Sequence, residues 1–196
     1  MVRSSTAAGS VRERLLDAAD KLFYAEGVHA VGIDRVLETA GVAKASLYGT
    51  FGSKDNLVAA YLAMRSQRIR ERVTAEIDKH EDPRARALAP FDYLITRAAE
   101  GNYRGCPFIN ACAEGPSLPE VAREASADHR RWRRELFLGL ATDLGASDPE
   151  ELAKRITVLY DGAVVGSSMD SDPSAGKIAR ELAEKLIDAA KPRRKK

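Results

Sequence analysis

The chain has 196 residues, a formal net charge of +2, 44% hydrophobic residues and 31% charged residues. This composition is that of a soluble globular protein, long enough to bury one large core or two small ones. No apolar run approaches the roughly 18 residues needed to span a membrane, and the first ten residues lack the apolar segment of a secretion signal. We therefore expect a cytoplasmic protein without membrane contact.

The chain begins with a small, polar segment, residues 1–9, which we expect to be disordered. Ser10 and Glu13 then form an S-x-x-E capping box, which predicts that the first helix starts at Val11. Gly27 is expected to end this helix. Apolar residues recur along it at helical spacing and predict a buried face that consists of Val11, Leu15, Ala18, Leu22 and Phe23.

The stretch from 33 to 55 has the pattern of a helix-turn-helix. A short helix with one apolar stripe ends at Gly41, and a second begins at about Lys44, with Leu47 and Phe51 facing inward. Two short helices joined by such a turn can place the second in a DNA major groove. The other residues of the second helix are small, hydroxyl-bearing or cationic, which suits close approach to bases and phosphates: Lys44, Ala45, Ser46, Tyr48, Gly49 and Thr50.

Helical patterns continue to the end of the chain. Ser53 is expected to cap a long helix over about 54–79, and Glu81-Asp82-Pro83 marks a break after it. There is no strand pattern, no Gly-rich phosphate loop and no G-x-S-x-G or H-E-x-x-H motif. The sequence therefore predicts an all-α fold of about nine helices, the remaining ones near 84–100, 107–113, 118–144, 149–169 and 173–190.

The helix expected over 118–144 carries both an apolar stripe and a run of arginines. We expect Arg130, Arg131, Arg133 and Arg134 to lie on a solvated face, opposite a stripe that consists of Val121, Ala125, His129, Trp132, Leu136 and Leu140. His129 and Trp132 are interpreted either as core residues or as ligand contacts.

Cys106 and Cys112 are too few for a disulfide framework and lack partners for a zinc site. We interpret them as small buried apolar side chains, with a redox switch as the alternative. A remote alternative is an enzyme that uses Cys106, Cys112 and His129, but no spacing supports such a nucleophile. No metal ion or cofactor is expected.

Charges in residues 1–55 cancel. Seven cationic residues (Arg3, Arg12, Arg14, Lys21, Arg35, Lys44, Lys54) stand against seven acidic ones (Glu13, Asp17, Asp20, Glu26, Asp34, Glu38, Asp55). This balance counts against a diffuse electrostatic DNA binder. A compact reader must instead cluster its few cations at the DNA face.

The run RERLLDAADKLFYAEGVHAVGIDRVLETAGVAKASLYGTFGSKDNLVAAYL, and above all AGVAKASLYGTFGSKDNL, resembles the DNA-binding domain of the TetR family of transcriptional regulators. The segment RGCPFINACAE resembles a subset of the same family. The resemblance implies a three-helix helix-turn-helix domain over 10–55. It also implies a helical ligand-binding and dimerisation domain over 56–190. The residues after it, KPRRKK at 191–196, are a basic tail.

The resemblance also implies which residues meet DNA. Lys44 is expected to contact a phosphate or a guanine. Tyr48 is expected to contact a phosphate and a thymine methyl group, and Lys54 is expected to bind a phosphate. Tyr48 as a partly buried core residue and Lys54 as an ordinary surface lysine remain alternatives. The full set of candidate DNA-binding residues is Gly32, Arg35, Lys44, Ala45, Ser46, Tyr48, Gly49, Thr50 and Lys54.

The chain departs from the family at three positions. Both helix caps in the helix-turn-helix usually carry Ser or Thr, but here they are Gly32 and Ala43, so phosphate contacts there must use backbone N–H groups alone. Leu37 stands where the family usually has alanine. We expect these departures to affect sequence specificity more than the fold.

The last two helices are amphipathic, as in a four-helix interface between two chains, and the resembled family dimerises there. The candidate interface consists of Leu152, Ile156, Leu159, Gly162, Ala163, Gly166, Ile178, Leu182 and Leu186. Candidate contacts to an apolar or amphipathic effector are Phe91, Leu94, Tyr103, Phe108, Asn110, Cys112, His129, Trp132 and Tyr160.

The functional expectation is a ligand-responsive repressor that binds a palindromic double-stranded operator as a homodimer. Ligand binding would favour a conformer that holds the two recognition helices at the wrong spacing. A transcriptional activator and a ligand-independent regulator of the same fold are the alternatives.

Overall fold

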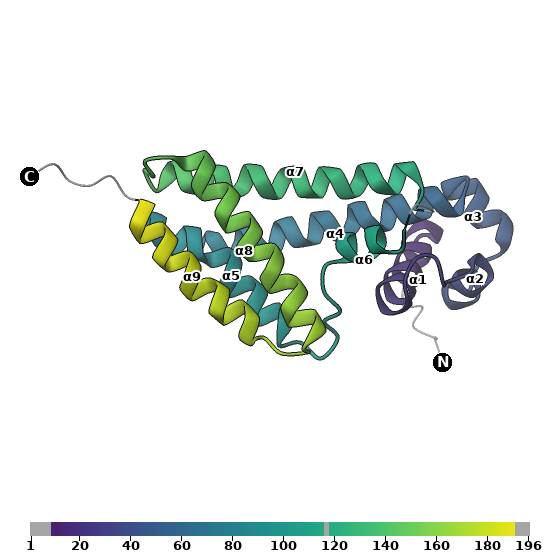
Figure 1. Ribbon diagram of the computed structural model, residues 1–196. Helices are drawn as coiled ribbons and strands as arrows, with labels where there is room; N and C mark the ends of the chain where they lie inside the picture. The colour runs from purple at the N-terminus through teal and green to yellow at the C-terminus, as the bar shows by residue number, and fades with distance from the viewer. Residues whose placement is uncertain (1–8, 116–117, 191–196) are drawn as a thin grey trace, which may run out of the picture. The chain divides into compact units, whose positions relative to one another are not determined.

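The structure is a computed structural model that describes residues 9–115 and 118–190, and within these residues it contains nine helices and no strand (Figure 1). The expected all-α fold of about nine helices is confirmed. The predictions for the N-terminal segment up to residue 8 and for the tail at 191–196 lie outside the described residues.

The helices form two compact units. The first comprises the residues up to Arg65 together with Pro107–Ser126, and the second comprises Ser66–Cys106 together with the residues from Ala127 onward. Helices α4 (Lys54–Ile77) and α7 (Glu120–Asp143) each contribute to both units. These two units differ from the two domains predicted from sequence, which meet at residue 55. The predicted boundary between a DNA-binding and a ligand-binding domain stays a prediction.

The first unit contains the helix-turn-helix, and its helix ends follow from local sequence. Ser10 Oγ accepts the Glu13 N–H at 3.2 Å while the Glu13 carboxylate accepts the Ser10 N–H at 2.7 Å, which completes the predicted capping box. Gly41, at φ 62° and ψ 41°, takes the left-handed conformation that stops a helix and turns the chain. The helices of this unit are α1 (Val11–Glu26), α2 (Ile33–Ala40), α3 (Lys44–Phe51), α6 (Pro107–Ala113) and the adjoining parts of α4 and α7.

Buried side chains and one arginine hold the helix-turn-helix together. Leu15, Val36 and Leu47 are all fully buried. Arg14 donates from Nε to the Ala40 carbonyl at 3.0 Å and also donates to the Gly41 carbonyl, so α1 satisfies acceptors that the end of α2 leaves unpaired. Val11 is 39% exposed, so its predicted burial is wrong, because the core-facing side of α1 begins one turn later.

The second unit is built on α5 (Pro83–Ala98), α8 (Pro149–Met169) and α9 (Ser174–Ala190), with the adjoining parts of α4 and α7. In it α9 packs against both α8 and α5 (Figure 1). Asp82 and Asp148 cap α5 and α8 by accepting backbone N–H groups three residues on, at 2.9 and 3.0 Å.

An aromatic cluster lies at the centre of the second unit. The Phe91 and Phe137 rings contact the Tyr160 ring edge to face, with centroids 5.4 and 5.5 Å apart. All three residues are buried. Edge-to-face pairs stabilise a core beyond the area that they bury, by about 0.5–1.5 kcal/mol each.

The buried face of α7 differs from the predicted one by about one residue. Trp132, predicted on the buried stripe, is half-buried, whereas Arg133, predicted on the solvated face, is only 6% exposed. The buried positions of α7 recur every three or four residues and are Ala122, Ser126, His129, Arg133, Phe137, Leu140 and Ala141. Arg130, Arg131 and Arg134 are exposed, as predicted.

The predicted interface stripe of α8 is partly wrong as well. Leu152, Ile156 and Ala163 are 2–4% exposed because they pack into the core of their own chain. The exposed apolar stripe of α8 lies on the other side of the helix and consists of Val158, Gly162, Val165 and Met169. On α9, the predicted residues Ile178 and Leu182 are exposed, at 57% and 44%.

The two glycines of α8 have different surroundings. A Cβ built on Gly166 would lie 3.0 Å from the Ala175 Cβ, so this glycine allows close packing within the chain. Nothing lies within 4 Å of a Cβ built on Gly162. Only Gly162 therefore leaves its side of the helix open.

Candidate nucleic-acid interface

One face of α3 is open to solvent. Lys44, Ala45, Gly49 and Thr50 are exposed, and Tyr48 is 48% exposed, so about half of its surface is open to solvent. A short helix with a fully buried Leu47 on one side and these residues on the other is suited to lie in a DNA groove.

The two hydroxyl groups of α3 are less available than expected. Thr50 Oγ1 donates its proton to the Ser46 carbonyl at 2.7 Å, within the helix. Ser46 itself is half-buried. In this conformation Thr50 can accept a hydrogen bond from DNA but has no proton left to donate.

The first turns of α2 and α3 present free backbone donors. Neither Gly32 nor Ala43 makes a side-chain capping bond, although both have the extended backbone of a cap residue. The first N–H groups of a helix have no partner inside it and point out along its axis. Such groups bind phosphate oxygens.

Two of the expected DNA-contacting cations are paired in the free protein. Arg35 forms two hydrogen bonds with the Glu26 carboxylate, one of 2.9 Å from Nη2 and a shorter one from Nη1. Lys44 Nζ lies 3.4 Å from Asp34 Oδ1, with both side chains more than half exposed. These pairs account for part of the charge balance of this region, and DNA that contacted either cation would have to compete with its acidic partner.

Lys54 opens α4 and is half-buried. Ser53 caps this helix, since its Oγ accepts the Asn56 N–H at 3.1 Å. Burial lowers the pKa of the Lys54 ammonium, against the opposing effects of Glu114 and Asp55. The Lys54 ammonium therefore lies near acidic groups of its own unit.

Glu114, after the end of α6, binds the loop between α1 and α2. Its two carboxylate oxygens accept the backbone N–H groups of Val28 at 2.9 Å and of His29 at 2.6 Å. Gly27, at φ +97°, makes room for this contact, because a Cβ there would lie 2.8 Å from Glu114 Oε1. Sequence reasoning missed Glu114, since nothing local links a carboxylate to amides 85 and 86 residues away.

We expect Glu114→Ala to expose the Val28 and His29 amides and to destabilise the first unit. Hydrogen bonds to charged groups contribute about 1.5–3 kcal/mol each. Amide hydrogen exchange at the two residues and thermal unfolding measure the effect. Glu120→Ala is the control, because Glu120 pairs with Arg123 at the surface. Unchanged exchange at both amides in Glu114→Ala would contradict the role of this carboxylate.

We expect Gly49→Ala to stabilise the protein by about 1 kcal/mol while it weakens DNA binding. Nothing in the chain lies within 4 Å of a Cβ built on this exposed glycine, and alanine is the better helix former. A DNA strand lying against α3 would meet the added methyl group. Gly139→Ala, at an equally open and exposed site in α7, should stabilise the protein without changing DNA binding. If both variants bind DNA equally well, DNA does not approach Gly49.

The candidate effector-contacting residues of the second unit divide into core and near-surface groups. Phe91, Leu94 and Tyr160 are buried in the aromatic core. Tyr103 is half-buried, and its hydroxyl donates a hydrogen bond to the Val164 carbonyl oxygen at 3.4 Å.

Three further candidates belong to the first unit. Phe108 is buried, whereas Asn110 and Cys112 are exposed. The prediction that Cys112 is a buried apolar side chain is therefore wrong; Cys106, in the second unit, is half-buried.

His129 is buried and neutral. Arg70 Nε donates to Ser66 Oγ at 3.2 Å, and Ser66 Oγ lies 3.0 Å from His129 Nδ1. The Ser66 hydroxyl and the His129 ring thus share a hydrogen bond, whose direction depends on the tautomer of the ring. Burial, followed by the charges of Arg133 and Arg70, lowers the pKa of His129 to about 3.

No helix of the described residues has the length and apolar character to cross a membrane. The same residues contain no group of three or more His, Cys, Asp or Glu side chains arranged to hold a metal ion.

Comparison with known proteins defines the class to which this fold and site belong. The family described as "Bacterial regulatory proteins, tetR family" matches residues 15–61, and the family described as "BetI-type transcriptional repressor, C-terminal" matches residues 107–191. A TetR-family transcriptional regulator from Streptomyces coelicolor has the same fold, with a TM-score of 0.84 and 32% identity over 93% of this chain and 96% of that one. The chain belongs to the TetR family of transcriptional regulators.

Two curated relatives show the range within the family. The HTH-type transcriptional regulator BetI of Rhizobium meliloti is 26% identical over 178 residues, which are 91% of this chain and 88% of that protein. The HTH-type transcriptional activator FasR of Mycolicibacterium smegmatis is 34% identical over 87 residues, 42% of this chain and 40% of that protein. The comparisons point to DNA-binding transcriptional regulators.

Proposed function

We propose that this regulator is a ligand-responsive repressor that binds a palindromic operator as a homodimer. The observation that carries the proposal is the open face of α3, where Tyr48 is 48% exposed beside the uncapped backbone donors that start the helix and a cation at Lys44. Phosphates would position the helix through the backbone donors and Lys44, and bases would be read by the residues that follow.

The homodimer is proposed from the exposed apolar stripe of α8. Val158 is 72% exposed and Met169 is 80% exposed, with Gly162 and Val165 between them on the same side. Large exposed apolar side chains in a contiguous stripe mark an interaction site. A two-fold interface would pair this stripe with its own copy and would set the recognition helices about 34 Å apart.

Repression, and its relief by a ligand, are proposed from the C-terminal part. The family that matches residues 107–191 is described as that of a repressor. A ligand in the second unit would have to bind one conformer more tightly than the other in order to release DNA. Activation is the second candidate, because a relative named as an activator shares 34% identity with part of this chain.

Selection of bound duplexes from random DNA tests the proposal. We expect a two-fold symmetric motif, and Tyr48→Ala should weaken binding to it. Lys44→Ala should weaken binding to all sequences and lower the salt dependence by about 0.9 for each phosphate that the protein no longer neutralises. Lys79→Ala, an exposed lysine just after the end of α4, is the matched control. Salt-sensitive binding without any motif would exclude a sequence-specific reader.

A transcription experiment that uses the selected motif then distinguishes a repressor from an activator. Placed across a promoter in a purified transcription reaction, the operator should lower transcription when the protein is added. An increase in transcription would favour the activator instead.

A further inference from the structure

Arg133 is a buried cation with incomplete hydrogen bonding. It is 6% exposed on α7, and its Nε has no hydrogen-bond partner among the described residues. Leaving a buried donor unpaired destabilises the fold, and more so for a charged group. Native structures keep few such groups, and an unpaired one often marks the place of a bound water or ligand.

The counter-ion of Arg133 is poorly placed. Arg133 Nη2 lies 2.6 Å from Asp161 Oδ1, yet this oxygen receives no properly directed hydrogen bond from the described residues. Asp161 is also shared, because Arg130 Nη1 lies 3.1 Å from its Oδ2. Two guanidinium groups thus share one carboxylate, which leaves about one positive charge uncompensated.

Two neighbouring groups, His129 and Arg70, do not supply the missing anion. His129, one turn earlier on α7, is neutral. Arg70 of α4 adds a further cation whose hydrogen bonds go to Ser66 Oγ and to the backbone carbonyl of Asp128, while its guanidinium lies 5.2 Å from the Trp132 ring centroid. The electrostatic environment of Arg133 therefore favours a monoanion.

Helix α8 adds a second unpaired polar atom. Ser167 is 1% exposed, and its Oγ has no hydrogen-bond partner in the described part of the chain. It lies seven residues after Tyr160, so the two share the inward face of α8, about 10 Å apart along the axis. The Arg133 guanidinium lies 5.8 Å from the Tyr160 ring centroid. Buried groups of this side of α8 thus combine polar atoms with aromatic surface.

We propose that Arg133 binds the carboxylate of the effector, and that the effector is a small organic acid. The carboxylate accepts hydrogen bonds from Nε and Nη2 side by side, the two-point geometry in which arginine binds carboxylates best. It replaces the misaligned contact with Asp161. This inference rests on the proposed ligand response and names its chemical class.

Formate, the smallest carboxylate, tests the site itself. The Nε–Hε signal of Arg133 is followed by nuclear magnetic resonance in the full-length protein and is assigned by its loss in Arg133→Lys. We expect formate to shift this signal saturably, whereas the neutral isostere formamide and an equal concentration of chloride should not. Asp161→Asn should tighten formate binding, because it removes the competing carboxylate. If formate produces no saturable shift, or no more than chloride does, a water molecule completes the hydrogen bonding of Arg133 and the proposal fails.

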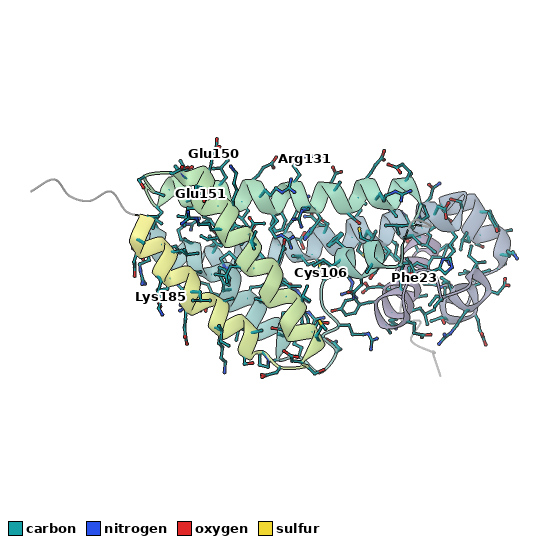
Figure 2. The ribbon with its side chains drawn as sticks, viewed as in Figure 1. Phe23, Cys106, Arg131, Glu150, Glu151 and Lys185 are labelled. Carbon is teal, nitrogen blue, oxygen red and sulfur yellow. The ribbon has the colours of Figure 1, made fainter. Side chains whose placement is uncertain are left out.

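A second measurement asks whether this site acts on DNA binding. 4-Phenylbutyrate and decanoate are compared with their primary amides as competitors of operator binding. We expect the acids to weaken operator binding by about ten-fold, in the usual range of coupling between sites, and Arg133→Met to abolish the effect. Arg131→Met is the matched control, since Arg131 points away from the helices and is 65% exposed (Figure 2). Thermal unfolding of both variants shows that each remains folded.

The outcomes separate the two proposals. Amides that release the operator as well as the acids do, or acids that act equally on Arg133→Met, would overturn the role of Arg133. If formate binds at Arg133 but none of the acids changes operator affinity, the anion site stands and the ligand response of the proposed function fails.

Discussion

Val158→Glu is expected to turn a dimer into monomers and to weaken operator binding by about 10²-fold or more. Val158 is 72% exposed in the stripe of α8 that we propose as the dimer interface. In a two-fold interface the substitution acts twice and places two carboxylates on an apolar surface. A monomer holds a single half-site and loses the effective concentration that the second half-site supplies.

Sedimentation and operator titration at fixed salt measure this effect. Leu138→Glu, a matched change at a 37% exposed leucine of α7, should leave both the dimer and operator binding unchanged. If Val158→Glu sediments as a dimer of wild-type stability, the apolar stripe of α8 is not the interface. Weaker operator binding by a dimer that stays intact would point to a change elsewhere in the chain.

The free energy of unfolding is expected to fall steeply as the pH drops below 6.5, because His129 is buried neutral. Its pKa is about 3 in the folded protein, whereas the unfolded chain has the ordinary histidine value of 6.5. Between these values the unfolded chain binds a proton that the folded chain does not. Stability therefore rises with pH across this window, by up to ~1.4 kcal/mol per pH unit from this residue.

Comparison with His129→Gln isolates this contribution. The variant should lose the extra slope between pH 6.5 and about 5, above the range in which most carboxylates titrate. Arg70→Met should narrow the window, because removing a neighbouring cation raises the pKa of His129. Urea unfolding across the pH range measures both slopes. Equal slopes for wild type and His129→Gln would show that His129 takes up its proton without unfolding.

The helix boundaries could be predicted because each rests on a few neighbouring residues. Ser10 with Glu13, Gly41, Asp82 and Asp148 are local signals for helix ends, and each acts in the structure as its type predicts. The expected long helix over 54–79 ends slightly earlier, at Ile77. Helix ends of this kind can be predicted without knowing which other helices pack against them.

The faces of the helices were harder to predict. Helix α8 carries apolar residues on two sides, and periodicity does not say which side a chain buries in its own core. Ile156 faces that core, while Val158 faces solvent. In α7 the buried face is shifted by one residue from the predicted face, so Arg133 is buried in place of Trp132. Neighbouring positions lie about 100° apart around a helix, so one residue is enough for this change. The burial of Arg133 was not predicted because an arginine is rarely buried.

The exposure of the candidate DNA-contacting residues could be predicted from the sequence, but the ion pairs that two of them form with acidic residues could not. Sequence showed that Lys44 and Arg35 have acidic neighbours, but pairing requires the turns that bring Asp34 and Glu26 close in space. Glu114 had no signal at all, because its partners are backbone amides, which look the same at every residue.

The ion pairs of Arg35 and Lys44 have a consequence for how the regulator finds its operator in a chromosome. Affinity for DNA of arbitrary sequence comes almost entirely from cations that replace condensed counterions. A genome offers about 10⁶–10⁹ such competing sites, and cations already engaged with Glu26 and Asp34 are held back from them. Exposed pairs open at a cost of about 0–1 kcal/mol each, which base contacts can offset at the operator but nothing offsets on bulk DNA. We therefore expect the two pairs to shift the protein modestly from bulk DNA towards the operator.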